Sequence, residues 1–153
     1  MDEIEVLLNE IVEARKGIDA IFVSELKQGF LLDSSKTEKG RHPDLVKKLG
    51  GQAGAGGSAM THMSVLQSFQ RRISDFGDET GLGELKLTIL QLGEKGDDVI
   101  KGTLVAYISH FKGMPIVIAF VNASPQDDNL GNIVFYCEQH IKNVRKLVGN
   151  KYG

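Results

Sequence analysis

The sequence is poor in several features that define whole classes of proteins. It contains one cysteine, three prolines and no tryptophan in 153 residues. A single cysteine excludes an internal disulfide, and together with an acidic N-terminus it favours a reducing cytoplasm over secretion. The longest apolar run, residues 116–121, is too short to cross a bilayer. The net charge of -2 supplies no broad basic field for nucleic acid.

What remains has an ordinary globular composition. The chain is 41% hydrophobic and 25% charged, which argues against disorder and against a membrane span. Its length suffices for one domain with a real core. We therefore expect a single cytoplasmic domain over residues 1–153, whose partners are proteins.

The hydrophobic periodicity predicts the element order α-β-β-α-β-β-β-α. Helices are expected where apolar residues recur every three or four positions, over residues 2–16, 58–76 and from 128 or 129 to 148. Strands are expected in short apolar or alternating runs, over residues 18–23, 30–32, 85–92, 103–108 and 116–121. Tight turns within each group predict an α+β fold, with a five-stranded antiparallel sheet and helices on both faces.

A glycine-rich stretch, "GGQAGAGGSAM" at residues 50–60, leads into the second long helix. Glycines before a helix can cradle a phosphate, but a Walker-type loop needs a lysine after its last glycine, and Ser58 follows Gly57. A dinucleotide fingerprint needs a preceding strand, and residues 45–49 are more helical than extended. We therefore interpret residues 33–57 as a flexible insertion and expect residues 36–57 to be disordered in the free protein.

Few side chains in the sequence have a spacing that suits catalysis. Cys137 and His140 lie three residues apart on the last helix, as a thiolate-imidazole pair would. Cys137, however, falls on the inner apolar face, where cysteine behaves as an inert hydrophobe. The four histidines show no paired spacing typical of metal ligands. We expect no enzyme activity, no metal and no cofactor, and a hydrolase that uses Cys137 is the weakest alternative.

Three segments resemble the Roadblock/dynein light chain (Roadblock/LC7) family. They are "GIDAIFVSELKQGFLLDSS", "AMTHMSVLQSFQRRISDFG" followed by "ELKLTILQL", and "MPIVIAFVNASPQDDNLGNIVFYCEQHIKNVRKLV". The resemblance implies a homodimer whose sheets join edge to edge through residues 85–92, with helices like 58–76 paired across one face. It also implies a non-catalytic signalling scaffold or regulator of a small Ras-like GTPase. The insertion departs from the family pattern.

Two candidate surfaces follow from these expectations. The dimer interface is expected on the alternating strand, at Leu85, Leu87, Ile89, Leu90 and Leu92. The partner surface is expected on the polar face of the second helix and on the outer face of the last, at Ser64, Ser68, Arg71, Asp75 and Phe135. The alternative is a small-molecule sensor of PAS or GAF-like architecture, which would need polar groups among apolar ones in a cavity on the sheet. Tyr107 and His110 are its few inward polar candidates.

Overall fold

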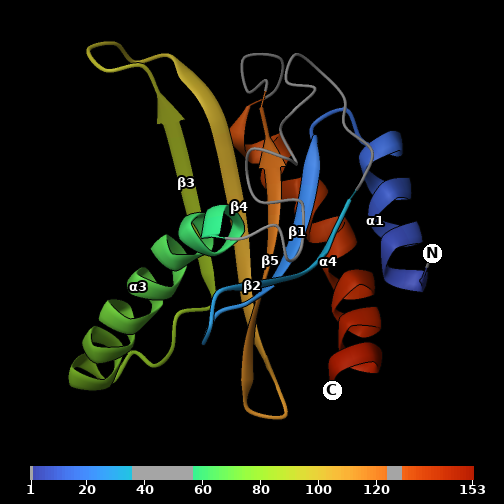
Figure 1. Cartoon of the computed structure of the whole chain (residues 1–153). Helices are drawn as coiled ribbons and strands as arrows, with labels where there is room; N and C mark the ends of the chain where they lie inside the picture. Colours follow the sequence, from blue (N-terminus) through green and yellow to red (C-terminus); the bar gives the residue numbers. More distant parts are fainter. Residues whose placement is uncertain (1, 36–56, 124–128) are drawn as a thin grey trace.

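The computed structural model describes residues 2–35, 57–123 and 129–153, and for residues 57–67 it describes the course of the helix without the side chains. Its elements are α1 (Glu3–Ala14), β1 (Ala20–Glu25), β2 (Phe30–Ser34), α3 (Gly57–Thr80), β3 (Leu87–Gly93), β4 (Ile100–Phe111), β5 (Met114–Asn122) and α4 (Leu130–Tyr152). This order confirms the expected α+β fold (Figure 1). Residues 36–56 lie outside the described residues, so disorder there stays a prediction.

The described strands form one five-stranded antiparallel sheet in the order β2-β1-β5-β4-β3. The turn between β4 and β5 consists of Lys112 and Gly113, whose φ angles of 51° and 79° are the left-handed values of a tight hairpin. Pairing of β1 with β5 joins the first hairpin to the β3–β5 meander. As a result, β2 and β3 are the two edge strands, and Figure 1 shows β3 at one margin of the sheet.

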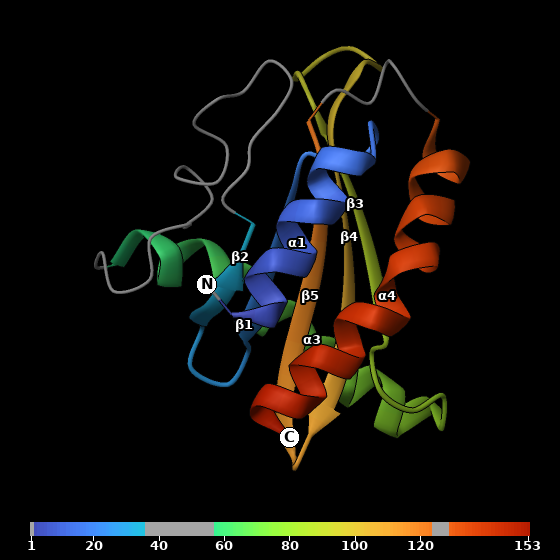
Figure 2. The ribbon, with the colours of Figure 1, turned by 90° about the vertical axis from the view of Figure 1, so that its right-hand side faces the viewer.

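Helices cover both faces of the sheet, as expected from the sequence. α1 and α4 pack side by side on one face, and α3 lies on the other (Figures 1 and 2). The larger core lies under α1 and α4, where Leu8, Cys137 and Phe120 are at most 1% exposed. A smaller apolar cluster occupies the α3 face of the sheet and includes Phe22 and Val117. The sheet is thus buried on both sides along its centre, which explains the near-continuous apolar sequence of β5.

Capping side chains set the starts of two helices where the sequence placed them. Asp2 accepts a hydrogen bond from the backbone N–H of Glu5 at 2.9 Å. Asn129 accepts one from the N–H of Asn132 at 2.8 Å, which settles the choice of N-cap at α4. Each cap satisfies an N–H group that the first turn of a helix leaves unpaired.

Several predicted boundaries were wrong. α3 does not end before Gly77 but continues to Thr80, and Gly81 then takes a left-handed φ of 73°, the usual conformation at a helix C-terminus. The strand expected at residues 85–92 is β3, which begins two residues later. The insertion also starts later than residue 33, because β2 extends to Ser34 and the N–H of Ser35 donates to the carbonyl of Ile21 at 2.9 Å.

Polar contacts hold α1 against α4 at both ends of α1. At the C-terminal end, Arg15 Nε donates to His140 Nε2 at 3.0 Å, and its guanidinium lies 5.5 Å from the ring centre of Tyr136. At the N-terminal end, Lys151 Nζ contacts the carboxylates of Asp2 at 2.5 Å and of Asp33 at 3.1 Å. These contacts fix the position of α4 on the sheet, and with it the outer face of α4.

Candidate interaction surface

The outer edge of β3 is apolar and its backbone is available for pairing. Leu87 and Ile89 are each 39% exposed, and Leu92 is 66% exposed. The N–H of Ile108 donates to the carbonyl of Lys86 at 2.9 Å, so Lys86 and every second residue after it bond to β4. Because bonding alternates along an antiparallel strand, the N–H and C=O groups of Leu87, Ile89 and Gln91 point away from the sheet. A strand of another chain could pair here.

The five predicted interface residues divide between the two faces of the sheet. Leu87 and Ile89 pair with Tyr107 and Val105, which belong to the core under α1 and α4. Leu85 and Leu90 pack instead against the apolar cluster on the α3 face, and Leu92 shares that face by alternation. The strand therefore presents apolar side chains on both faces, as well as a backbone edge that pairs with none of the described strands.

The C-terminal half of α3 carries an exposed apolar stripe. Phe69, Ile73 and Phe76 follow each other at spacings of four and three, on one side of the helix. Phe69 is 45% and Phe76 is 54% exposed, because α3 contacts the sheet chiefly through β2. Leu82, just after the helix, is 77% exposed. The sequence signal for this surface is the family resemblance, which implies that helices like 58–76 pair across one face.

The predicted partner residues of α3 lie on a different side of the helix from this stripe. Ser68, Arg71 and Asp75 are all exposed, and at 100° per residue they lie about 80–160° around the helix from Phe69 and Phe76. Ser64 lies in the part of α3 whose side chains are not described.

Phe135 is exposed on α4, as its position outside the apolar periodicity predicts. Its side chain is 57% exposed and its ring lies 6.2 Å from that of Tyr136. Since α4 and α3 lie on opposite faces of the sheet (Figure 2), Phe135 and the polar face of α3 cannot belong to one continuous contact area. The predicted partner surface is therefore two separate surfaces.

The flank of α4 nearest β4 bears a connected polar cluster. Tyr107 Oη donates to Glu138 Oε1 at 2.8 Å, Arg145 Nε donates to Ser109 Oγ at 3.1 Å, and the Arg145 guanidinium lies 5.4 Å from the Tyr107 ring centre. Burial, and then the hydrogen bond to Glu138, raise the pKa of Tyr107 above its usual value of 10.0. Tyr107 is therefore a neutral hydrogen-bond donor, and this cluster anchors α4 to the sheet.

The cysteine and histidine of α4 do not form a reactive pair. Cys137 is fully buried, and burial raises the pKa of its thiol to about 12, so the nucleophilic thiolate is not populated at neutral pH. His140 already accepts the hydrogen bond from Arg15. Among the side chains that the structure describes, in residues 2–35, 68–123 and 129–153, no group of three or more His, Cys, Asp or Glu is arranged to hold a metal ion.

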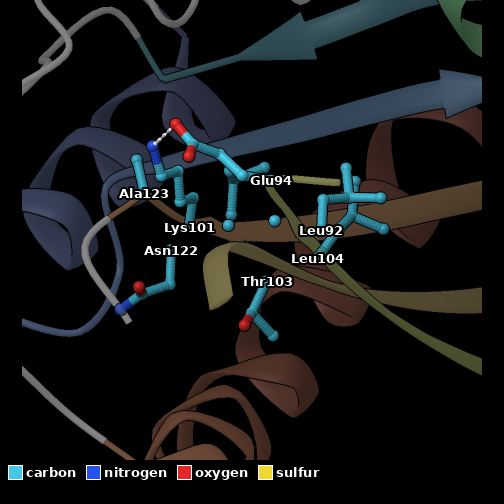
Figure 3. A pocket seen from close by; sticks show the side chains of 10 residues that line it. Leu92, Glu94, Lys101, Thr103, Leu104, Asn122 and Ala123 are labelled. Carbon is cyan, nitrogen blue, oxygen red and sulfur yellow. Dashed lines mark hydrogen bonds and ion pairs between the residues drawn. The ribbon is translucent and has the colours of Figure 1, made fainter. Parts of the chain in front are cut away.

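A pocket of about 410 Å³ lies at the end of the sheet beside the β3–β4 turn (Figure 3). Leu92, Leu104 and Val121 line it, and the ion pair between Glu94 and Lys101 stands at its rim. The nearby amide of Asn122 is already bonded to the carbonyl of Gly17 at 2.8 Å. Among the described lining residues, Glu94 and Lys101 pair with each other, and Asn122 bonds to Gly17, so these polar groups are already engaged within the chain.

The described helices are too short or too polar to span a membrane. None of them combines the length and the apolar composition needed to cross a bilayer. The longest, α3, carries charged residues through its C-terminal half.

The chain was compared with known proteins at three levels. No protein-family model matches it, and no curated protein sequence does. Among solved structures, MglB of Myxococcus xanthus matches with a TM-score of 0.61 at 11% identity, over 99% of this chain and 96% of that one. An MglB with a tetrameric arrangement matches with a TM-score of 0.61 at 12% identity, over 95% and 90% of the two chains. The gliding protein MglB of Thermus thermophilus matches with a TM-score of 0.57 at 12% identity, over 91% and 86%. At such identities the likeness establishes the fold, and it is the roadblock fold that the sequence resemblance predicts.

Proposed function

We propose that this protein is a non-catalytic, dimeric scaffold that binds a small Ras-like GTPase and regulates its nucleotide cycle or its localisation. The observation that carries the proposal is the combination of an apolar strand edge with an exposed apolar helix stripe, on a chain whose Cys137 is buried and whose His140 accepts a hydrogen bond from Arg15. The GTPase partner follows from the Roadblock/LC7 resemblance, and the roadblock fold supports it.

The dimer would join two β3 strands and two α3 helices. An exposed apolar strand edge promotes aggregation unless it is covered, and symmetric pairing of two copies covers it with the same surface on each side. The stripe of Phe69 and Phe76 would be buried by the same association, because aromatic residues are enriched at the centres of protein interfaces. The structural neighbour with a tetrameric arrangement is in keeping with a fold that self-associates.

Proline at Gln91 tests the dimer with little effect on the monomer. The Gln91 N–H faces away from β4 by the alternation described above, so the only backbone donor that Gln91→Pro removes points outward, and edge strands tolerate such prolines. The substitution also removes the side-chain contact with Thr103. In sedimentation equilibrium, the wild-type chain should form a dimer, and Gln91→Pro should sediment as the 16.7 kDa monomer.

Gln91→Ala is the matched control, because it also removes the side-chain contact with Thr103 but keeps the N–H. It should remain dimeric. A wild-type chain that stays monomeric at micromolar concentration, or a Gln91→Pro variant that still forms dimers, would contradict edge pairing.

The GTPase is expected on one of the two partner surfaces, the polar face of α3 or the region around Phe135. The test is binding of the purified chain to each small Ras-like GTPase of the same genome, loaded either with a non-hydrolysable GTP analogue or with GDP. Binding that differs between the two nucleotides, with an altered rate of GTP hydrolysis or exchange, is the expected result. Equal failure of all these GTPases to bind would reject the proposal.

A further inference from the structure

One face of β3 is left bare by the helices that cover the rest of that side of the sheet. Leu87 and Ile89 point to the same face as Tyr107 and Val105, their partners on β4, which are 4% and 0% exposed. Leu87 and Ile89 nevertheless remain 39% exposed. The uncovered strip therefore begins where β4 ends and continues to the edge at which we propose that a second copy pairs.

The neighbouring wall of this strip is α4. α1 contacts the flank of α4 that carries Tyr136 and His140, so the other flank, with Glu138 and Arg145, faces β3. Glu138 and Arg145 contact β4 through Tyr107 and Ser109. In a monomer the strip has this wall on one side only, and the other side is open.

Edge pairing would complete the groove and set its width. α1 contacts β1 and β2, so its axis lies over these two strands, and it packs on α4. The axes of packed helices are about 8–10 Å apart, which is roughly two strand spacings of about 4.8 Å. Counted from α1 along the strand order, the axis of α4 therefore lies over β5 and β4, about one and a half spacings from β3. Across a β3–β3 junction the two α4 axes are then about four spacings, or roughly 19 Å, apart. A helix placed midway between the two α4 helices would have its axis about 9–10 Å from each α4 axis, which is the usual distance between packed helices.

We propose that the dimer binds a single amphipathic α-helix of a partner protein in this groove, between the two α4 helices. Its apolar stripe packs on Leu87 and Ile89 of both copies, and its polar flanks meet Glu138 and Arg145 on each wall. The proposal rests on the proposed dimer, since each copy supplies half of the floor and one wall. The groove lies on the two-fold axis, so one helix occupies it and the stoichiometry is one helix per two chains.

Random 16-residue peptides displayed on phage provide a test that assumes no partner. Peptides selected on the immobilised full chain would be synthesised and measured by calorimetry, by circular dichroism in the bound state and by hydrogen exchange of the chain. We expect helical peptides that bind once per two chains and protect β3 and α4. Ile89→Ser should weaken their binding at least tenfold, whereas Val99→Ser, an exposed apolar position outside β3, should change it less than twofold.

Sedimentation of every variant in the same buffer separates the two proposals. A dimeric chain whose selected peptides bind once per chain, are not helical or are insensitive to Ile89→Ser would overturn the helix groove and leave the dimer intact. Failure to select any peptide on a dimeric chain, or tetramer formation that Ile89→Ser abolishes, would also overturn it. A monomeric wild-type chain would instead reject the dimer itself.

Discussion

Single side chains explain how α4 is held in place and why Cys137 and His140 do not form a reactive pair. Arg15, Arg145 and Lys151 each lie over an aromatic ring and each contact a polar side chain of another element. Cation–aromatic contacts of this kind contribute roughly 0.5–2 kcal/mol, depending on how far they are shielded from water. The partners of His140 and Tyr107 are thus structural. Of the two polar candidates for a sensor, Tyr107 is engaged in the contact with α4, and His110 is exposed, with its Nδ1 3.7 Å from Glu84 Oε2.

The contact between Arg15 and His140 predicts a stability that depends on pH. Burial, and then the positive charge of Arg15, lower the pKa of His140 below its usual 6.5. The unfolded chain then binds a proton more readily than the folded chain between the lowered pKa and 6.5. The stabilising contribution is therefore present above pH 6.5 and is lost as the pH falls from 6.5 through the lowered pKa.

His140→Gln provides the comparison, because an amide oxygen can still accept the hydrogen bond from Arg15 but does not titrate. Between about pH 7.5 and pH 5.5, around the ordinary histidine pKa, the Tm of the wild-type chain should fall further than that of the variant. Thermal unfolding followed by circular dichroism measures both. Parallel pH profiles would mean that His140 does not contribute to the pH dependence.

At the scale of elements, hydrophobic periodicity was sufficient to predict which segments are helices or strands and in what order they follow. It failed for features that depend on tertiary contacts, such as which molecule buries an apolar stripe. The apolar spacing of α4 predicted its buried side, and Ile133, Ile141 and Val148 are at most 2% exposed. In α3 the same periodicity puts Phe69 and Ile73 on one apolar side, but a stripe of apolar residues does not indicate whether the chain's own sheet or another molecule buries it. The end of α3 was missed because glycine usually terminates helices.

Gly77 continues the helix because the loop after α3 folds back onto it. The N–H of Gly83 donates to the carbonyl of Gly77 at 3.2 Å, and a Cβ on Gly77 would lie 1.7 Å from the carbonyl oxygen of Gly83. Alanine favours a helix interior by about 1 kcal/mol over glycine, but this overlap with backbone exceeds that gain. Gly77→Ala should therefore lower the free energy of unfolding, by about 1–3 kcal/mol in urea titrations.

Asp78→Ala is the control for Gly77→Ala, since Asp78 is exposed in the same turn. It should leave the unfolding free energy within about 0.5 kcal/mol of the wild-type value. If Gly77→Ala proves as stable as Asp78→Ala, the loop at Gly83 adjusts freely and does not set the approach of α3 to β3.

At the scale of the whole molecule, the sheet separates two sets of surfaces. The α3 side carries the exposed aromatic stripe and the polar face of α3, and the α4 side carries Phe135 and the strip of Leu87 and Ile89 (Figures 1 and 2). The sequence indicated which side chains leave the periodic pattern of their own element. The prediction of helices on both faces of the sheet was confirmed, but the order of the strands was not predicted, because their order along the chain does not reveal the pairing of β1 with β5.

This separation makes the role of Phe135 testable independently of the dimer. If Phe135 anchors a partner, Phe135→Ala should weaken binding of the GTPase identified above by roughly 1–3 kcal/mol, in the range of interface hot spots. Its Tm and its dimerisation should remain unchanged, because the side chain is 57% exposed and lies on α4, away from β3 pairing. Calorimetric titration measures the binding.

Gln139→Ala, an exposed change one turn along α4, controls for nonspecific effects on the helix. It should bind the GTPase normally. A Phe135→Ala variant that also binds normally would identify Phe135 as incidental surface, and one that unfolds at lower temperature would identify it as part of the fold.

The cation–aromatic contacts of α4 also determine what optical spectroscopy can detect. The chain has no tryptophan, and its three tyrosines are Tyr107, Tyr136 and Tyr152. Each lies 5.2–5.5 Å from a cationic group, and two of them belong to α4 while the third lies beneath it. Intrinsic fluorescence therefore reports the docking of α4 and none of the events at α3. Tyrosine fluorescence will therefore not change when another molecule binds over Phe69 and Phe76. A Phe76→Trp variant would provide a fluorescence signal for binding at α3.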